Sequence, residues 1–277
     1  MFETKFNIIP DDSSTLFICS GMQNYKQKFI NPDGKQLSTL QSCIRTNDLD
    51  LVGDGTHLTY FQMLGNFSFN GPDYEYSIEL WDAILQDLNI KNDCVIHYHP
   101  SRKDHKLLWN KRNYNCIPDE ECTWTDGNIG GNCCEVYIND LEIGNLVNTL
   151  NHSTDVGFGF ERILMILENK QKVHDTSLFN TNLEPVQRDF VRSIDCFYKN
   201  NIPPGNKGRN YVCRKLIRRI LPIKPEYEWN EWIRQENELK NKCLQVGKKL
   251  WRRHKDKSPK WWWESCGILE TEIKELS

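Results

Sequence analysis

Residues 154–162 read TDVGFGFER and residues 59–69 read TYFQMLGNFSF, and these two stretches determine how the rest of the chain is interpreted. In the first, Gly157 and Gly159 allow the backbone to approach a ligand closely. Asp155 precedes the glycines with a carboxylate that can bind an ammonium group, and Arg162 falls in the first turn of a predicted helix. From these residues alone, an ordinary helix start with an N-capping Asp155 and a surface Arg162 is the favoured interpretation.

The second stretch belongs to a predicted antiparallel hairpin. Residues 40–45 and 58–64 have strand character, and the TNDLDLVGDG segment between them is rich in turn-forming residues. Arg45 on one strand can bind phosphate oxygens in pairs, and Phe61 on the other offers a ring face to adenine. From these residues alone, ordinary packing of an arginine against a phenylalanine explains the pattern more simply.

The remaining pattern is mixed in the front part and helical in the back part. We predict strands at 94–99 and 135–138, a polar loop over 123–132 and a glycine turn over 155–159. Apolar spacing predicts helices over 76–88, 160–169, 183–198, 211–221 and 228–254. We therefore predict two domains, 1–171 and 172–277.

Cysteine content and charge limit the function classes. The chain has 11 cysteines but no CxxC pair, so we expect reduced thiols and no zinc, with a structural metal as the lesser alternative. Residues 198–260 hold 18 lysines and arginines against 6 acidic residues, although the whole chain has a net charge of −3. That asymmetry favours a polyanionic partner over a merely solvated helix surface. No signal peptide or membrane span is visible, so we expect a soluble, cytoplasmic protein.

Several segments in one order resemble alanyl-tRNA synthetases, which are class II aminoacyl-tRNA synthetases. FQMLGNFSF and DVGFGFERI resemble the second and third sequence motifs of that family, and further similar segments are FICSGMQNYKQKF, IHYHPSRKDHKLLW, LEIGNLVN, PPGNKGRNYVCRKLIRRI and WWWESCGILETEI. The similarity covers nearly the whole chain and is closest to the archaeal-type branch. It implies an α+β fold, in which an antiparallel sheet flanked by helices precedes a helical tRNA-recognition domain.

The resemblance also implies roles for individual residues. The motif arginines Arg45 and Arg162 would be catalytic, and the ATP-binding residues would be Arg45, Phe61, Gln62, Gly159 and Arg162. The alanine pocket would comprise Met63, Trp124, Asn145, Val147, Asp155 and Gly157. In the tRNA acceptor stem, Asn206 and Glu264 would recognise a G·U pair, and Arg209, Arg214 and Arg218 would face phosphates. Magnesium is expected with ATP. Its ligands are not assigned: Glu135 and Glu142 are two candidates, and a structural role for either carboxylate is the alternative.

The implied function is alanine–tRNA ligation: alanine is activated with ATP and transferred to alanine tRNA. The resemblance is to a minimal form, so we expect a monomer without editing in cis. The sequence departs from the family at Thr46–Asp48, where the loop is shortened, and at Gln62, which replaces a glutamate. These departures keep an alternative open, namely an enzyme that adenylates a small amino acid and passes it to an acceptor other than tRNA.

Overall fold

The computed structural model describes residues 2–11, 15–71, 74–179, 182–221 and 227–277. The chain forms two compact units, residues 1–179 and 180–277. This division lies later than the predicted boundary at 171/172. Residues just after 172 belong to the first unit because Val173 and Phe179 pack with Leu58 and Met165. The Val173 N–H also donates to the Gly55 carbonyl at 2.8 Å.

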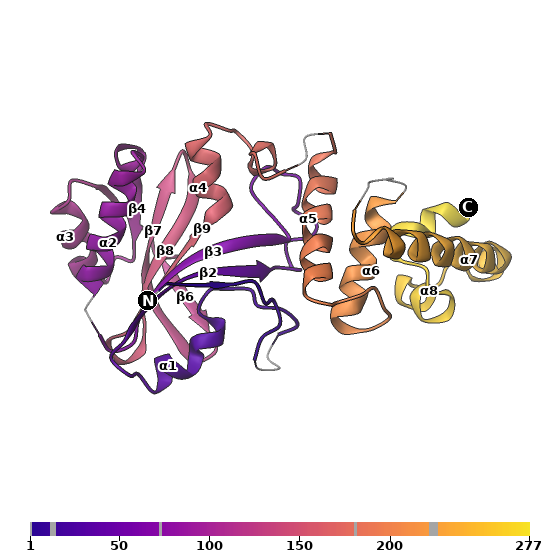
Figure 1. Cartoon of the computed structure of the whole chain (residues 1–277), viewed down its shortest axis with the longest axis horizontal. Helices are drawn as coiled ribbons and strands as arrows, with labels where there is room; N and C mark the ends of the chain where they lie inside the picture. Colours follow the sequence, from indigo (N-terminus) through magenta and orange to yellow (C-terminus); the bar gives the residue numbers. More distant parts are fainter. Residues whose placement is uncertain (1, 12–14, 72–73, 180–181, 222–226) are drawn as a thin grey trace. The chain divides into compact units, whose positions relative to one another are not determined.

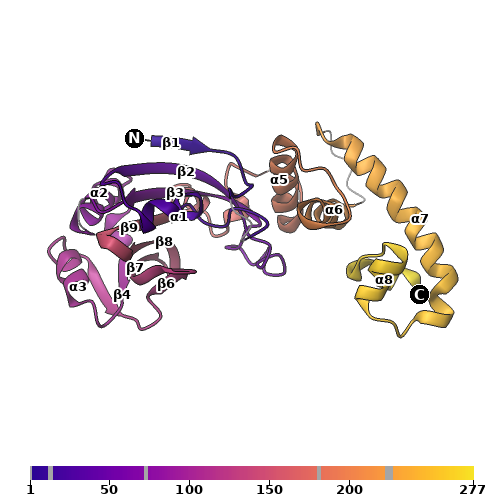
Figure 2. The ribbon, with the colours of Figure 1, turned by 90° about the horizontal axis from the view of Figure 1, so that it is seen from below.

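A mixed, mostly antiparallel sheet forms the centre of the first unit (Figure 1), in the order β1-β2-β3-β9-β8-β7-β4-β5, with β6 paired to β7. The pairs β1–β2 and β4–β5 are parallel, and the others are antiparallel. Figure 2 shows β1 beside β2 at one edge. The strands are β1 Phe2–Lys5, β2 Gln36–Ile44, β3 Tyr60–Ser68, β4 Val95–Tyr98, β5 Asn115–Pro118, β6 Thr123–Asp126, β7 Ile129–Ile138, β8 Leu141–Asn148 and β9 Thr154–Gly159.

Helices α2 (Tyr74–Asp87), α3 (Lys103–Asn110) and α4 (Phe160–Leu167) bury their apolar residues in one core with the sheet. Trp81 of α2 stacks on Phe158 of β9 with ring centroids 3.6 Å apart. Successive side chains of a strand point to opposite faces. Val156 and Phe158 therefore enter this core, whereas Asp155, Gly157 and Gly159 face the other side of the sheet.

The short helix α1 (Lys26–Ile30) contributes to a smaller apolar cluster. Phe29 packs there with Phe67 and Phe69 of the β3 region, and the ring centroids of Phe29 and Phe69 are 5.0 Å apart. The half-buried Trp124 of β6 packs against the same cluster. This cluster therefore supports Trp124, whose other contacts reach the cavity described below.

The structure corrects two predictions in the first unit. The predicted loop 123–132 is the β6–β7 hairpin, which a two-residue turn closes at Gly127, where φ is +65°. The predicted glycine turn 155–159 is strand β9, which pairs with β3 on one side and β8 on the other. Pairing on both sides outweighs the low strand preference of glycine. The predicted hairpin of β2 and β3 is confirmed.

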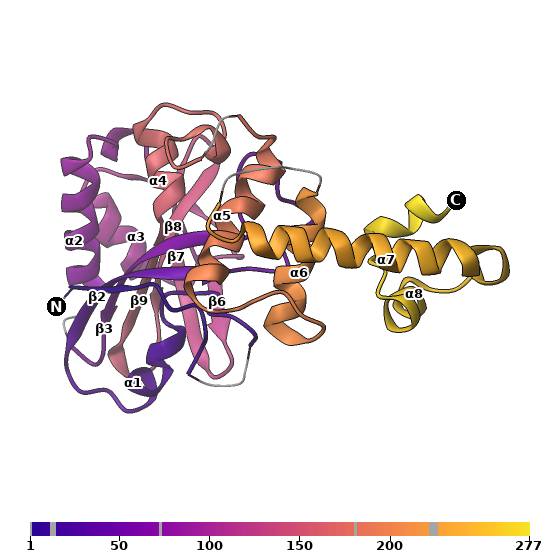
Figure 3. The ribbon, with the colours of Figure 1, turned by 45° about the vertical axis from the view of Figure 1, so that its right-hand side comes forward.

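The second unit is helical, as predicted. Its helices are α5 Pro185–Lys199, α6 Gly208–Ile220, α7 Asn230–His254 and α8 Pro259–Cys266. The Ser258 hydroxyl caps α8, and Gly267 ends it at a φ of +68°. A turn after α7 brings α8 back beside it (Figure 3), where Leu244 and Trp262 share an apolar cluster. Among the described residues, no helix is long and apolar enough to cross a membrane.

Candidate functional site

A cavity of about 430 Å³ opens on the sheet face opposite to α2 and α3. Nine of the residues implied by the family resemblance line it, namely Arg45, Phe61, Met63, Trp124, Asn145, Asp155, Gly157, Gly159 and Arg162. Arg45 directly follows β2, and the others come from β3, β6, β8, β9 and the first turn of α4. These segments lie together only in the folded chain. A cavity of this size falls in the range of small-molecule sites.

Asp155 lies in the central strand β9 and is 7% exposed. Within the described part of the chain, its carboxylate has no hydrogen bond or ion pair. Burial raises the pKa of Asp155 to about 7, and the neighbouring charge of Asp126 adds to the rise. A buried carboxylate without a partner is costly in its charged form, so it favours a cationic ligand in the cavity.

Next to Asp155, the cavity is narrow. A Cβ atom at Gly157 would lie 2.9 Å from the sulfur of Met63, and one at Gly21 would lie 3.4 Å from the same atom. The N–H of Gly21 donates to the Met63 sulfur at 3.1 Å. Met63 thus occupies the space between the two glycines and narrows the cavity where Gly157 lines it.

Arg45 directly follows β2, and its guanidinium is anchored at one nitrogen. Nε donates to the carbonyl of Cys19 at 3.1 Å, and the guanidinium carbon lies 4.9 Å from the ring centroid of Phe61. Among the described residues, its terminal nitrogens form no hydrogen bond. Arg45 therefore has donors available for an anion, and it covers part of the ring that was predicted to receive adenine.

Arg162 lies in the first turn of α4, and a contact with β8 fixes the orientation of its side chain. Its Nη1 donates to the backbone carbonyl of Glu142 at 2.6 Å and lies 3.6 Å from the carboxylate of the same residue. The side chain of Arg162 is 28% exposed. Its charge is therefore partly balanced and remains accessible from the cavity.

Glu161 lines the cavity and was not singled out from the sequence. It is 1% exposed, and each carboxylate oxygen accepts the backbone N–H of Gln62 at 3.0 Å. This links the start of α4 to β3. The only signal in the sequence is an acidic residue beside Arg162 in a first helical turn, which is common in helices without such a role.

Two predicted site residues do not line the cavity. Gln62 lies between Phe61 and Met63 in β3, so alternation directs its side chain to the opposite face. Val147 is fully buried and packs behind Trp124 with Cys122 and Cys133. Gln62 therefore contributes its backbone to the site, and Val147 supports the wall.

Other polar residues that line the cavity are Ser20, Asp48, Thr56, His57, Glu135 and Glu142. The backbone N–H groups of His57 and Thr56 hold the pKa of Asp54 well below its usual range, and His57 Nδ1, 2.5 Å from the same carboxylate, adds to this effect. The hydroxyl of Tyr137 donates to Glu135 Oε2 at 2.8 Å. Burial raises the pKa of Glu135. The Glu135 carboxylate already accepts a hydrogen bond. Among the described residues, that of Glu142 has only the longer contact of 3.6 Å with Arg162, so Glu142 is the better candidate to bind magnesium.

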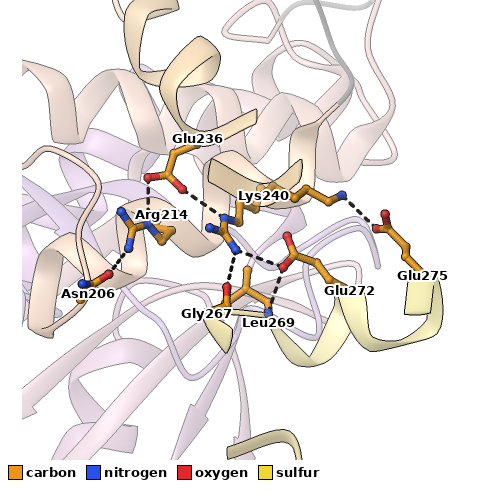
Figure 4. A network of polar contacts seen from close by, with 9 residues as sticks. Asn206, Arg214, Glu236, Lys240, Gly267, Leu269, Glu272 and Glu275 are labelled. Atoms are coloured by element: carbon orange, nitrogen blue, oxygen red, sulfur yellow. Dashed lines mark hydrogen bonds and ion pairs between the residues drawn. The ribbon is translucent and has the colours of Figure 1, made fainter. Parts of the chain in front are cut away.

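The second unit holds an internal ion-pair network around two of the predicted tRNA-binding arginines (Figure 4). Arg214 Nε donates to Glu236 at 2.8 Å. Arg218 donates to Glu236 and Glu272, each at 3.1 Å, and to the carbonyl of Gly267 at 2.8 Å. The side chain of Arg218 is 1% exposed and that of Arg214 is 10% exposed.

These contacts withdraw most of Arg214 and nearly all of Arg218 from solvent, where the expected phosphate contacts would be made. Both guanidiniums are buried because Glu236 and Glu272 lie on elements that pack against α6, which no local pattern of positive charge reveals. Arg214 also donates to Oδ1 of Asn206, which is itself exposed. Glu264 is exposed and lies 3.8 Å from Lys260, and Arg209 is half-buried.

The positive charge of the second unit is instead exposed towards the end of α7. Exposed cationic residues there are Lys248, Lys249, Arg252, Arg253, Lys255, Lys257 and Lys260. The sequence indicated this excess charge but not which arginines remain accessible.

Comparison with known proteins agrees with the fold. The family described as tRNA synthetases class II (A) matches residues 2–130. The chain is 31% identical over 280 residues to the alanine–tRNA ligase of Ehrlichia ruminantium (strain Gardel), covering 76% of this chain and 31% of that protein. It is 30% identical over 285 residues to that of Ehrlichia chaffeensis, covering 79% and 32%. The chain thus spans about a third of the length of the curated relatives it matches.

Among solved structures, the chain is similar to pyrrolysyl-tRNA synthetase from Desulfitobacterium hafniense. The identity is 15% and the TM-score 0.38, over 61% of this chain and 56% of that chain. A likeness at this level carries no argument about the site.

Proposed function

Because the chain carries a class II tRNA synthetase domain and has alanine–tRNA ligases as homologues, we propose that it activates L-alanine with ATP and transfers it to alanine tRNA. The observation that carries this proposal is the carboxylate of Asp155, which is buried, lacks a partner among the described residues and lies in a cavity narrowed by Met63. An α-amino acid with a methyl side chain supplies both an ammonium group and the required small size.

In the proposed complex, the alanine ammonium pairs with Asp155. The methyl group lies against Gly157 and Met63, with Trp124 and Asn145 as further walls. An ammonium beside Asp155 compensates the burial of its charge, so binding of alanine should favour the ionised carboxylate. Such a pocket excludes larger side chains by steric contact, but it discriminates weakly against glycine.

Arg45 and Arg162 are proposed to act on the nucleotide. Adenine would replace the Arg45 guanidinium on the ring of Phe61, which would free the terminal nitrogens of Arg45 for the α-phosphate. Arg162, which β8 holds in place, would contact the nucleotide from the other side, with the backbone of Gly159 close by. Both cations lie where negative charge develops during adenylation.

The cavity also fits a magnesium ion that accompanies ATP. Glu142 offers a carboxylate at the wall, and magnesium is commonly held by one or two carboxylates together with substrate phosphates. When bound, the ion would neutralise phosphate charge. The part of Glu142 itself is to hold the ion and, through its backbone carbonyl, to orient Arg162.

Two chemical steps follow from this arrangement. A carboxylate oxygen of alanine attacks the α-phosphorus of ATP, and the bond to pyrophosphate breaks, which gives alanyl-adenylate. A hydroxyl of the terminal tRNA ribose then attacks the carbonyl carbon, loses its proton and releases AMP. The site residues contribute by positioning and by stabilising charge, and no covalent bond to the protein forms.

The helical unit is proposed to read the acceptor stem. Oδ1 of Asn206 accepts a hydrogen bond from Arg214. The side-chain amide nitrogen of Asn206 therefore remains as a donor for base acceptors in the minor groove. The exposed carboxylate of Glu264 can accept from the exposed amino group of guanine in a G·U pair. Arg209 remains a candidate phosphate contact, whereas Arg214 and Arg218 are now assigned to holding the unit together.

Alanine-dependent exchange of pyrophosphate into ATP tests the activation step. We expect exchange with alanine, weaker exchange with glycine and none with valine. The Asp155→Asn variant should lose more than about 100-fold in alanine kcat/KM, because a buried ion pair would lose one partner. Exchange near the wild-type rate in this variant would contradict the proposed ammonium site.

A second candidate is an adenylating enzyme that passes a small amino acid to a different acceptor. The burial of Arg214 and Arg218 favours it, because two expected phosphate contacts are withdrawn from solvent. Exchange activity without any charging of alanine tRNA would support this alternative.

A further inference from the structure

Cys122 and Cys133 lie opposite each other at the β6–β7 hairpin. Cys122 directly precedes β6, and its carbonyl accepts the N–H of Cys133 at 2.9 Å. Both side chains are fully buried and pack with Val147 and the half-buried Trp124. The hairpin brings together two thiols whose spacing in the sequence matches no common metal motif.

Glu135 follows on the same face of β7, because residues two apart in a strand share a face. Its Oε1 lies 3.8 Å from the sulfur of Cys133. The two sulfur atoms and a carboxylate oxygen all lie within 4.8 Å of one another. Sulfur at about 2.3 Å and oxygen at about 2.1 Å from a tetrahedral zinc ion are about 3.6 Å apart, so a small contraction would bring these atoms into one coordination shell.

The backbone around these groups is closely packed. A Cβ at Gly131 would lie 2.0 Å from the carbonyl oxygen of Asn148, and one at Gly130 would lie 2.5 Å from that of Trp124. The strands can approach this closely only because both positions are glycine. Donor groups on such paired strands are held more accurately than groups on loops.

We propose that Cys122, Cys133 and Glu135 bind one zinc ion. Two thiolates favour zinc over magnesium or calcium, and three protein ligands leave the fourth position to water. Trp124 packs against the thiols and lines the main cavity, and Glu135 lines it as well. The ion therefore fixes the β6–β7 wall of the amino-acid pocket. The expectation of no zinc rested on the spacing of cysteines in the sequence. Such spacing does not reveal two cysteines that a hairpin brings together.

Zinc content tests the site without any measurement of enzyme activity. The full chain is purified without chelator, passed through gel filtration and analysed for metals. We expect about one zinc per chain, and a decrease of more than about 10-fold in Cys122→Ser, Cys133→Ser and Glu135→Gln. Cys134→Ser is the matched control: Cys134 is the next residue on β7 and is fully buried, but it contacts His105 on the opposite face at 3.5 Å.

Titration of the metal-free chain with Co²⁺ alone gives an independent result. A thiolate-to-cobalt charge-transfer band should appear in the wild type and in Cys134→Ser, and it should be absent from the Cys122→Ser/Cys133→Ser double variant. Glu135→Gln retains both buried thiols, so it serves where a serine variant fails to fold by circular dichroism. The proposal is overturned by a zinc-free wild type that gives no cobalt band, by equal zinc in the double variant, or by a Cys122–Cys133 disulfide in freshly purified protein.

Discussion

Glu161 accepts the backbone N–H of Gln62 with both carboxylate oxygens at 3.0 Å, and thereby joins the first turn of α4 to the beginning of β3. Arg162 is the next residue on α4, and Phe61 is the residue before Gln62 on β3. One buried carboxylate therefore sets the separation of the two side chains that are proposed to hold the nucleotide.

Replacing Glu161 should affect both stability and nucleotide binding. Glu161→Ala leaves the N–H of Gln62 without its acceptor in a buried place, which costs about 1–3 kcal/mol of unfolding free energy. The KM for ATP should rise more than the KM for alanine, because the separation of Phe61 and Arg162 changes while Asp155 stays in place. Denaturant unfolding and exchange kinetics measure the two effects, with exposed Glu120→Ala as the control. A stability loss with both KM values unchanged would leave Glu161 a purely structural role.

Alanine binding should depend on pH through Asp155. Burial raises its pKa to about 7 in the free protein, so the carboxylate is largely neutral below pH 7 and charged above it. Only the charged form pairs with the ammonium. The Kd for alanine should therefore fall as the pH rises from 5.5 to 8, as calorimetry can measure.

The Asp155→Asn variant is the matched control for that titration. It should bind alanine weakly and without the change around pH 7. A wild-type Kd that stays constant over this range would contradict the assignment of the ammonium site.

The small size of the pocket can be tested at Gly157. A Cβ there would lie 2.9 Å from the Met63 sulfur, so Gly157→Ala should lower kcat/KM for alanine by about 10- to 200-fold and spare glycine. The double variant Gly157→Ala/Met63→Ala should regain part of the alanine activity, because it removes the side chain that the new methyl group meets. An equal loss of kcat/KM for alanine and for glycine would show that Gly157 does not contact the methyl group of the substrate.

The arginine network of the second unit should contribute mainly to stability. Arg218→Ala leaves the buried Glu272 without its cationic partner and leaves Glu236 with Arg214 alone, so it should destabilise the unit by about 3–5 kcal/mol. Exposed Arg253→Ala on α7 should change stability by less than about 0.5 kcal/mol. Thermal unfolding of both variants provides the comparison. Equal midpoints would mean that Arg218 is not a structural residue and would return it to the list of phosphate contacts.

Local patterns predicted much of this fold. The β2–β3 hairpin and the helices of the second unit follow from strand-forming runs and helical spacing, and both are confirmed. Strand β9 was predicted as a turn because its glycines suggest one, and only pairing with β3 and β8 makes it a strand. The burial of Asp155 follows from that pairing, so the sequence suggested its carboxylate as a candidate without predicting its raised pKa.

The sequence did not predict contacts between residues that are far apart along the chain. Arg218 and Glu272 are far apart in sequence and meet only when the end of the chain packs on α6. Gln62 was assigned by resemblance of a motif, whereas strand alternation decides which face its side chain takes. Cys122 and Cys133 become neighbours through a turn at Gly127, which lies in the segment that was predicted to be a loop.

Aminoacylation of an alanine tRNA transcript with labelled alanine and ATP, beside the same transcript with its G·U pair changed to G·C, tests the central claim most directly. We expect charging of the first transcript and little of the second, with Asn206→Ala reducing that difference. Absence of charging on both transcripts, while alanine-dependent pyrophosphate exchange persists, would contradict the claim that this chain is an alanine–tRNA ligase.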